Sequence, residues 1–253
     1  MKFLVLIPAR YESTRFPGKP LAKICGEEMI VRVCKQVGKT GFPLAVATDN
    51  EEIKAVVENN GFRAVMTLPT HKSGTERVAE AYRNLCSDAD VVINVQGDEP
   101  FILPEQIKKL ANIFEKGKNV SIATLAKPFR KEDGMEALED PNLVKVVFSK
   151  DRRAVYFSRN IIPFVRKYPK TEWLEKCKFY THIGIYAYKA DVLGNIVKLP
   201  ESPLEKAESL EQLRWLENGL TIGVDISEHS TIGIDTPSDL KKAEEFLAGG
   251  SFE

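Results

Sequence analysis

Short apolar segments alternate with amphipathic segments along the first 150 residues of the chain. Near-continuous apolar runs rich in Val and Ile are typical of strands buried on both faces of a sheet, and helical patterns between such strands are typical of βαβ units. The predicted strands are residues 2–8, 44–48, 63–66, 91–96, 120–125 and 144–148, and the predicted helices are residues 29–39, 51–60, 74–85 and 104–116. This alternation predicts an α/β fold with a buried, mostly parallel sheet flanked by helices.

The pattern changes after residue 150. Strand-like runs at 155–157, 161–164 and 179–188 surround a charged, aromatic segment at 166–178. The chain then returns to a helical pattern at 203–218, strand-like runs at 219–225 and 231–235, and a terminal helix at 238–247. Because no repeat or low-complexity linker is visible, we expect a single domain over 1–253 with an embedded β-rich subregion at about 151–203, acting as a flap or a dimerisation element.

Composition excludes several classes of protein. The chain has 36 Lys and Arg and 36 Asp and Glu residues, so its formal charge of zero disfavours a protein that coats long nucleic acids, which needs surplus cations. The apolar runs are far shorter than the roughly 20 residues that span a bilayer, and no secretory signal is visible, so we expect a cytoplasmic protein. The 4 cysteines and 3 histidines form no metal-binding spacing, which favours reduced thiols over a zinc site or disulfides.

The loop after the first predicted strand concentrates positive charge. It combines three cations with hydroxyls and stiffening prolines at the carboxyl end of a buried strand, where open α/β sheets bind ligands. Backbone N–H groups, hydroxyls and cations in such a loop can wrap a polyphosphate, although the loop is neither a Walker A motif nor a dinucleotide fingerprint. The alternative is a solvated basic loop. The cations and hydroxyls are Arg10, Arg15, Lys19, Ser13 and Thr14.

Two carboxylates follow other predicted strands. Asp98 comes shortly after the buried run at 91–96, and its hard oxygen ligands suit Mg²⁺, which usually takes one or two carboxylates plus phosphate oxygens and water. The alternative for Asp98 is a cap for the helix that begins near Pro104. Asp235 precedes Thr236 and Pro237, which is also a common helix-cap arrangement, so a purely structural role is an equal alternative from the pattern alone.

Seven blocks of the sequence together resemble one family. The resemblance extends from about residue 3 to residue 246 and is to the 3-deoxy-manno-octulosonate cytidylyltransferases. The segment at 166–178 matches least well, and Glu12 and Phe16 are minor departures from the family pattern. The blocks are P-A-R-x-x-S-x-R-x-x-G-K-P at 8–20, H-x-S-G-T-E-R at 71–77, N-V-Q-G-D-E-P at 94–100, Y-F-S-R at 156–159, H-x-G-I-Y at 182–186, L-E-Q-L-R at 210–214 and D-T-P at 235–237.

The resemblance implies a Rossmann-like nucleotidyltransferase that moves CMP from CTP to the anomeric 2-hydroxyl of 3-deoxy-manno-octulosonate (KDO), for lipopolysaccharide biosynthesis. It implies Mg²⁺ as the cofactor, held by Asp98 and Asp235, and a homodimer. Lys19, Arg15 and Asp98 would be catalytic. The implied nucleotide-binding residues are Ala9, Arg10, Ser13, Arg15, Lys19, Ser73, Gly74, Arg77 and Gln96. For Ser73, an ordinary N-cap role is an alternative that can coexist with ligand binding.

The second half would supply the sugar site. Arg159 is the best cation for the carboxylate of KDO, because a guanidinium matches a carboxylate bidentately. Whether Glu208 or Glu211 faces the sugar is undecided, and His182 could instead be a structural histidine. The two tryptophans, Trp173 and Trp215, are expected in the core or an interface. The implied KDO-binding residues are Gln96, Arg159, His182, Tyr186, Glu208, Glu211 and Gln212.

Two competing interpretations stay open at this point. A related nucleotidyltransferase could use another acid sugar or a sugar phosphate, although a phosphate acceptor would require more cations in the second half than Arg159. A non-catalytic nucleotide-binding regulator is a different class of protein, and the presence of Lys19, Asp98 and Asp235 argues against it.

Overall fold

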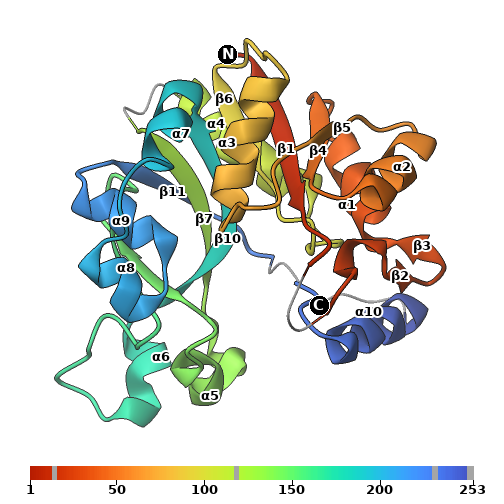
Figure 1. Ribbon diagram of the computed structural model, residues 1–253. Coiled ribbons are helices and arrows are strands. Elements are labelled where there is room, and N and C mark those ends of the chain that lie inside the picture. Colours follow the sequence, from red (N-terminus) through yellow and green to blue (C-terminus); the bar gives the residue numbers. More distant parts are fainter. Residues whose placement is uncertain (13–15, 117–119, 230–232, 250–253) are drawn as a thin grey trace. The chain divides into compact units, whose positions relative to one another are not determined.

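The computed structural model describes residues 1–12, 16–116, 120–229 and 233–249 (Figure 1). The chain divides into two compact units, one of Met1–Lys108 with Thr231–Glu253 and the other of Lys109–Ser230, so the boundary falls within helix α4 (Pro104–Glu115). These bounds differ from the predicted subregion at about 151–203. That the chain works as one domain with an embedded flap or dimerisation element stays a prediction.

The first unit is built on parallel strands in the order β6-β1-β4-β5. Helix α3 lies over β1 and β6 (Figure 1). The parallel order follows from the alternation of apolar strands and amphipathic helices that the sequence predicts. The elements of this unit are β1 (Phe3–Ala9), β4 (Leu44–Thr48), β5 (Ala64–Met66), β6 (Val91–Asn94), α1 (Met29–Gly38), α2 (Glu51–Asn59) and α3 (Gly74–Asn84).

Helix starts in the first unit follow from side-chain caps. The carboxamide oxygen of Asn50 accepts hydrogen bonds from the N–H groups of Glu52 and Ile53, 2.9 and 3.0 Å away, at the start of α2. The hydroxyl of Ser73 accepts from the N–H of Glu76 at 3.2 Å and caps α3. Such caps satisfy N–H groups that have no partner inside the helix, and they fix where each helix begins.

A terminal helix completes the first unit. Helix α10 (Pro237–Gly249) packs its Ala243 into a small core with Ile24, Met29, Phe101 and Ile234. The remaining short elements here are η1 (Lys19–Leu21), β2 (Lys23–Ile24) and β3 (Glu27–Glu28). Burial of Ile234 anchors the segment that carries Asp235.

The second unit contains a mixed sheet. Strand β7 (Ile122–Pro128) pairs in parallel with β11 (Ile222–Ile226) and antiparallel with β10 (Tyr180–Lys189). Strand β8 (Lys145–Phe148) pairs antiparallel with β9 (Ala154–Ser158) and with β10. The helices are η2 (Lys131–Asp133), α5 (Gly134–Glu139), η3 (Lys170–Glu172), α6 (Trp173–Lys176), α7 (Ala190–Ile196), α8 (Pro203–Glu208) and α9 (Glu211–Glu217).

Two predicted elements are wrong, and a third is irregular where the structure describes it. Residues 161–164 form no strand, and Pro163 has no N–H to donate to a ladder. The helix predicted at 203–218 is two helices, because Ser209 adopts a left-handed conformation with φ 52°. The part of the strand at 231–235 that the structure describes is irregular. There the N–H of Ile234 donates to the carbonyl of Asp98 at 2.9 Å, and that of Asp235 donates to the Asp239 carboxylate.

The α/β class with a mostly parallel sheet and flanking helices is confirmed. Trp173 and Trp215 are 5% and 1% exposed, which confirms their prediction as core residues. None of the helices in the described part of the chain combines the length and apolar composition needed to cross a bilayer.

Candidate active site

A polar pocket of about 470 Å³ lies in the first unit, at the carboxyl ends of β1 and β6 and the N-terminus of α3. Loops at this edge of a parallel sheet are where α/β folds bind ligands. The pocket therefore brings together residues from distant parts of the sequence. Its lining residues are Pro8, Ala9, Arg10, Lys19, Pro20, His71, Lys72, Ser73, Gly74, Arg77, Gln96, Gly97, Asp98 and Asp235.

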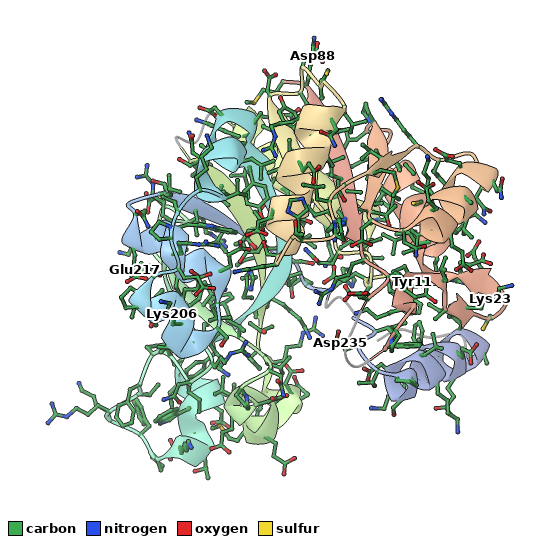
Figure 2. The ribbon with its side chains drawn as sticks, viewed as in Figure 1. Tyr11, Lys23, Asp88, Lys206, Glu217 and Asp235 are labelled. Atoms are coloured by element: carbon green, nitrogen blue, oxygen red, sulfur yellow. The ribbon has the colours of Figure 1, made fainter. Side chains whose placement is uncertain are left out.

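One lysine faces two carboxylates in this pocket. The ammonium of Lys19 lies 2.5 Å from a carboxylate oxygen of Asp98 and 3.1 Å from one of Asp235. Lys19 follows Gly18, whose positive φ of 68° turns the loop, and the Gly18 N–H donates to the carbonyl of Tyr11. Tyr11 and Asp235, both labelled in Figure 2, come from opposite ends of the chain.

The two carboxylates suit a divalent cation. Asp98 and Asp235 each present oxygen to the same positively charged group, which is what a metal ion bound between them would require. Among the residues that the structure describes, no group of three or more His, Cys, Asp or Glu side chains could hold a metal. The two carboxylates of Asp98 and Asp235 fit Mg²⁺, which needs only one or two carboxylates when phosphate and water supply the remaining oxygens.

Close backbone packing shapes the floor of the pocket. A Cβ added at Gly97 would lie 2.7 Å from the carbonyl oxygen of Pro8, which is closer than real Cβ contacts allow. A Cβ at Gly74 would lie 3.3 Å from the ring of Pro8. The absence of a side chain at Gly97 lets the end of β6 approach the end of β1 and keeps Asp98 beside the loop that carries Lys19.

Arg77 is buried beside the pocket. Its side chain is 3% exposed, and its guanidinium donates to the Asp49 carboxylate and the Thr67 hydroxyl, both at 2.6 Å. These bonds tie α3 to the ends of β4 and β5. Removal of one partner of a buried ion pair is costly, so Arg77 holds the helix N-terminus, with Ser73 and Gly74, in place.

The other predicted nucleotide-binding residues divide into two groups. Ala9, Arg10 and Gln96 line the pocket, and the amide of Gln96 donates to the side-chain oxygen of Asn94 at 3.2 Å. Ser13 and Arg15 lie outside the described residues. The alternative prediction for Asp98 was a cap for the helix that begins near Pro104. The Asp98 carboxylate bonds to Lys19, whereas the N–H of Leu103, just before α4, donates to the side chain of Gln106.

His71 and Lys72 also line the pocket, although the sequence did not single them out as site residues. The signal was that His71 opens the second matching block and that both residues directly precede the α3 cap. Both residues could have been found by predicting that the loop before α3 forms a wall of the pocket.

In the second unit, backbone carbonyls hold the guanidinium of Arg159. It donates to the carbonyls of Glu208, Pro141 and Ser209, at 2.6, 3.0 and 3.3 Å. Two of these carbonyls lie at the break between α8 and α9, so the split of the predicted single helix orients Arg159. A guanidinium has five N–H groups, and these contacts use three of them.

The structure distinguishes Glu208 from Glu211. The Glu208 carboxylate accepts from the hydroxyl of Ser158 at 2.7 Å and from the N–H of Arg159 at 2.8 Å, so both of its oxygens hold the end of β9. Glu211 accepts from Arg214 at 3.0 Å, and Gln212 is buried. Glu208 thus contacts the protein through both oxygens, a role that its position in the sequence did not indicate.

A bulge in β10 brings two predicted sugar ligands together. Ile183 pairs with Leu125 and Tyr186 pairs with Thr124, so two extra residues of β10 bulge out between them. In a regular strand, residues four apart are separated by roughly 13 Å. Here the ring centroids of His182 and Tyr186 are 5.3 Å apart. The Gly-Ile pair of this sequence block is the bulge itself.

The two side chains of this pair are neutral, with Tyr186 buried and His182 half-buried. The Thr124 hydroxyl has one proton, which it shares between the carbonyls of Ile183 and Ile185, 3.1 and 2.9 Å away. It therefore accepts a hydrogen bond from Nε2 of His182, 2.9 Å away. Burial lowers the pKa of His182 to about 3. The imidazole is therefore neutral, with its proton on Nε2 and a lone pair on Nδ1.

Tyr186 is 8% exposed, and its hydroxyl has no hydrogen-bond partner among the described residues. Its ring packs edge-on against Trp215, with centroids 5.1 Å apart. Burial raises the pKa of the Tyr186 hydroxyl well above its usual range. A buried hydroxyl without a partner is costly unless a ligand supplies one, so this atom is a candidate contact for a polar ligand.

Comparison with known proteins defines the class of the chain. Residues 4–225 match the model of the family described as cytidylyltransferase. The 3-deoxy-manno-octulosonate cytidylyltransferase of Parabacteroides distasonis is 55% identical over 98% of this chain and 99% of that protein. The protein of the same name from Phocaeicola vulgatus is 56% identical, over 98% of each chain.

A solved structure agrees. The structure of CMP:2-keto-3-deoxy-manno-octonic acid synthetase complexed with CTP is 38% identical, with a TM-score of 0.90 over 99% of this chain and all of that one. The chain therefore belongs to the cytidylyltransferases and, within them, to the 3-deoxy-manno-octulosonate cytidylyltransferase family.

Proposed function

We propose that the chain transfers CMP from CTP to the anomeric 2-hydroxyl of KDO and releases pyrophosphate. The hydroxyl oxygen forms a bond to the α-phosphorus of CTP, the bond from that phosphorus to the bridging oxygen breaks, and the hydroxyl proton leaves to solvent. The observation that carries the proposal is the first-unit pocket, in which Lys19, Asp98 and Asp235 meet beside the N-terminus of α3.

Nucleotide binding is assigned to the first unit. Arg10 and Lys19 supply positive charge for the triphosphate, with Ser13 and Arg15 as further contacts proposed from the sequence. Ser73 and Gly74 present the N-terminus of α3, where backbone N–H groups favour carbonyl and phosphate oxygens. Phosphoryl transfer depends mainly on positioning and charge neutralisation, and Lys19 is the residue best placed to stabilise the departing pyrophosphate.

Mg²⁺ is the proposed cofactor, held by Asp98 and Asp235. When bound, the ion would neutralise charge on the triphosphate and on the leaving group. Lys19 contacts both of these carboxylates, so its ammonium is within reach of any phosphate oxygen that they help to place.

Sugar recognition is assigned to the second unit, with Gln96 as a proposed contact from the first. Arg159 has two guanidinium N–H groups beyond those that bond to carbonyls, which suits a bidentate carboxylate. The Nδ1 lone pair of His182 and the hydroxyl of Tyr186 are proposed partners for sugar hydroxyls. Glu211 and Gln212 remain proposed contacts, and Glu208 is proposed to act by holding Arg159.

A homodimer, a cytoplasmic location and a role in lipopolysaccharide biosynthesis are further proposals. They rest on the family and on the sequence pattern. Gel filtration with light scattering would test the dimer directly.

The experiment that tests the function is a pyrophosphate-release assay with CTP, KDO and Mg²⁺, with the product identified by mass spectrometry. We expect CMP-KDO, and we expect EDTA to stop turnover until Mg²⁺ is restored. Pyrophosphate release with another acid sugar or a sugar phosphate, and none with KDO, would overturn the assignment.

A further inference from the structure

A cluster of acids on α3 faces the segment that precedes this helix. Segment 68–72 joins the end of β5 to the cap of α3 and supplies two pocket-lining residues, His71 and Lys72. Glu76 and Glu80 lie one turn apart on α3 and therefore on the same face of the helix. Both carboxylates bond to this segment.

Glu80 makes the central contacts. One of its oxygens accepts from the N–H of Leu68 at 2.9 Å and also bonds to Nε2 of His71, while the other lies 3.5 Å from the amide of Asn84. The side chains of Glu80 and His71 are only 14% and 15% exposed. Burial acts to raise the pKa of Glu80, but the hydrogen bonds from His71 and Leu68 outweigh it and lower the pKa.

Glu76 supports the same segment from the next turn. Its carboxylate accepts from the N–H of Lys72 at 2.8 Å and lies 3.7 Å from Nδ1 of His71. The lowered pKa of Glu80 keeps its carboxylate ionised, and an ionised carboxylate can only accept hydrogen bonds. Nε2 of His71 therefore carries the proton in its bond to Glu80. Hydrogen bonds to a charged group are stronger than neutral ones and fix geometry more firmly.

We propose that Glu80, acting through His71, is a positioning residue that fixes segment 68–72 as a wall of the nucleotide pocket, with Glu76 as a second tether. This inference rests on the proposed function, because it assigns the pocket to CTP. Glu80 itself does not line the pocket, and its effect on CTP passes through His71 and Lys72. The wall is then set by helix α3, the same helix that presents Ser73 and Gly74.

Direct titration of CTP into the full chain, with Mg²⁺ present, tests the proposal. Glu80→Gln keeps the size of the side chain and removes its charge. We expect about 10-fold weaker CTP binding in this variant, with kcat at saturating CTP and the KM for KDO within about 2-fold of the parent. Glu58→Gln, at an exposed site on α2, is the matched control and should leave CTP binding unchanged.

A second variant separates positioning from simple loss of stability. In His71→Gln, the side-chain amide can still donate to Glu80, so its CTP affinity should lie between those of the parent and His71→Ala. The double variant His71→Ala with Glu80→Gln should bind CTP no more than about 2-fold more weakly than the weaker single variant, because the two residues act as one unit. Hydrogen exchange should quicken at 66–73 in Glu80→Gln, and not throughout the protein.

The outcomes are distinguishable. If the parent chain does not bind CTP, the proposed function itself fails. If the parent binds CTP and Glu80→Gln binds it equally well, or if Glu80→Gln weakens KDO and CTP alike with faster exchange everywhere, the positioning role of Glu80 is overturned.

Discussion

The first-unit pocket and the pair of His182 and Tyr186 in the second unit differ in charge state. The pocket contains ion pairs, with Lys19 between Asp98 and Asp235 and with Arg77 on Asp49. In the second unit, the half-buried His182 and the buried Tyr186 are both neutral. A triphosphate and a metal ion are charged and require charged partners, whereas sugar hydroxyls are neutral and can bond to neutral donors and acceptors. This contrast supports the proposal that the first unit binds the nucleotide and the second unit binds the sugar.

Removal of the Lys19 ammonium from the first-unit pocket should have the largest effect on activity. Lys19→Met keeps the length of the side chain but removes the ammonium, and we expect kcat to fall by about 10²- to 10³-fold. Steady-state pyrophosphate release measures the effect. Lys23→Met, at an exposed lysine paired with Glu28 at 3.5 Å, is the control and should retain full activity. A Lys19→Met enzyme with normal kcat would remove Lys19 from the mechanism.

A methyl group at Gly97 tests whether backbone packing sets the ionic site. Because the added Cβ would meet the Pro8 carbonyl at 2.7 Å, the strand ends must separate. We expect Gly97→Ala to lower kcat/KM by about 10-fold and to cost about 1–3 kcal/mol of unfolding free energy. Gly194→Ala in α7 has open space around the new Cβ and is the matched control. Unchanged kcat/KM in Gly97→Ala would show that the close approach is dispensable.

The neutral His182 in the second unit predicts that stability depends on pH, and this effect is smaller than those expected at Lys19 and Gly97. The pKa of His182 is about 3 in the folded chain and about 6.5 when unfolded, so the unfolded chain takes up this proton first as the pH falls. The stabilisation from neutral His182 is complete above pH 6.5 and is lost progressively down to pH 3.

Urea unfolding at pH 7 and pH 5 measures this loss. We expect His182→Gln to lose less stability than the parent over this interval, by at most about 2 kcal/mol. His229→Gln, at an exposed position, should follow the parent. If the parent and His182→Gln lose the same free energy of unfolding between pH 7 and pH 5, His182 is not held neutral.

Most of the fold was predictable because the apolar periodicity is local. Strand β4 and helix α2 begin where the pattern predicts, since a buried run and an Asn50 cap determine them within a few residues. The break at Ser209 was not predictable, because it needs a left-handed backbone at a non-glycine residue and its carbonyls contact Arg159, about 50 residues away.

The candidate site was predictable to a similar degree. Lys19, Asp98 and Asp235 each follow a strand or a turn signal, but only the folded chain brings the Lys19 ammonium within 3.1 Å of both carboxylates. His71 was missed because its contacts with Glu76 and Glu80 on α3 are visible only in the folded chain. The two bonds of Glu208 to the end of β9 were not predictable, because their partners Ser158 and Arg159 lie about 50 residues away in the sequence.

The division of substrates between the units is tested most directly in the Arg159→Lys variant, by measuring CTP affinity and the KM for KDO in the same preparation. Lysine cannot reproduce the planar, multiply bonded guanidinium, so we predict an increase of about 10-fold or more in the KM for KDO and a CTP dissociation constant within about 2-fold of the parent. An Arg159→Lys enzyme that lost CTP affinity and kept its KM for KDO would contradict the account.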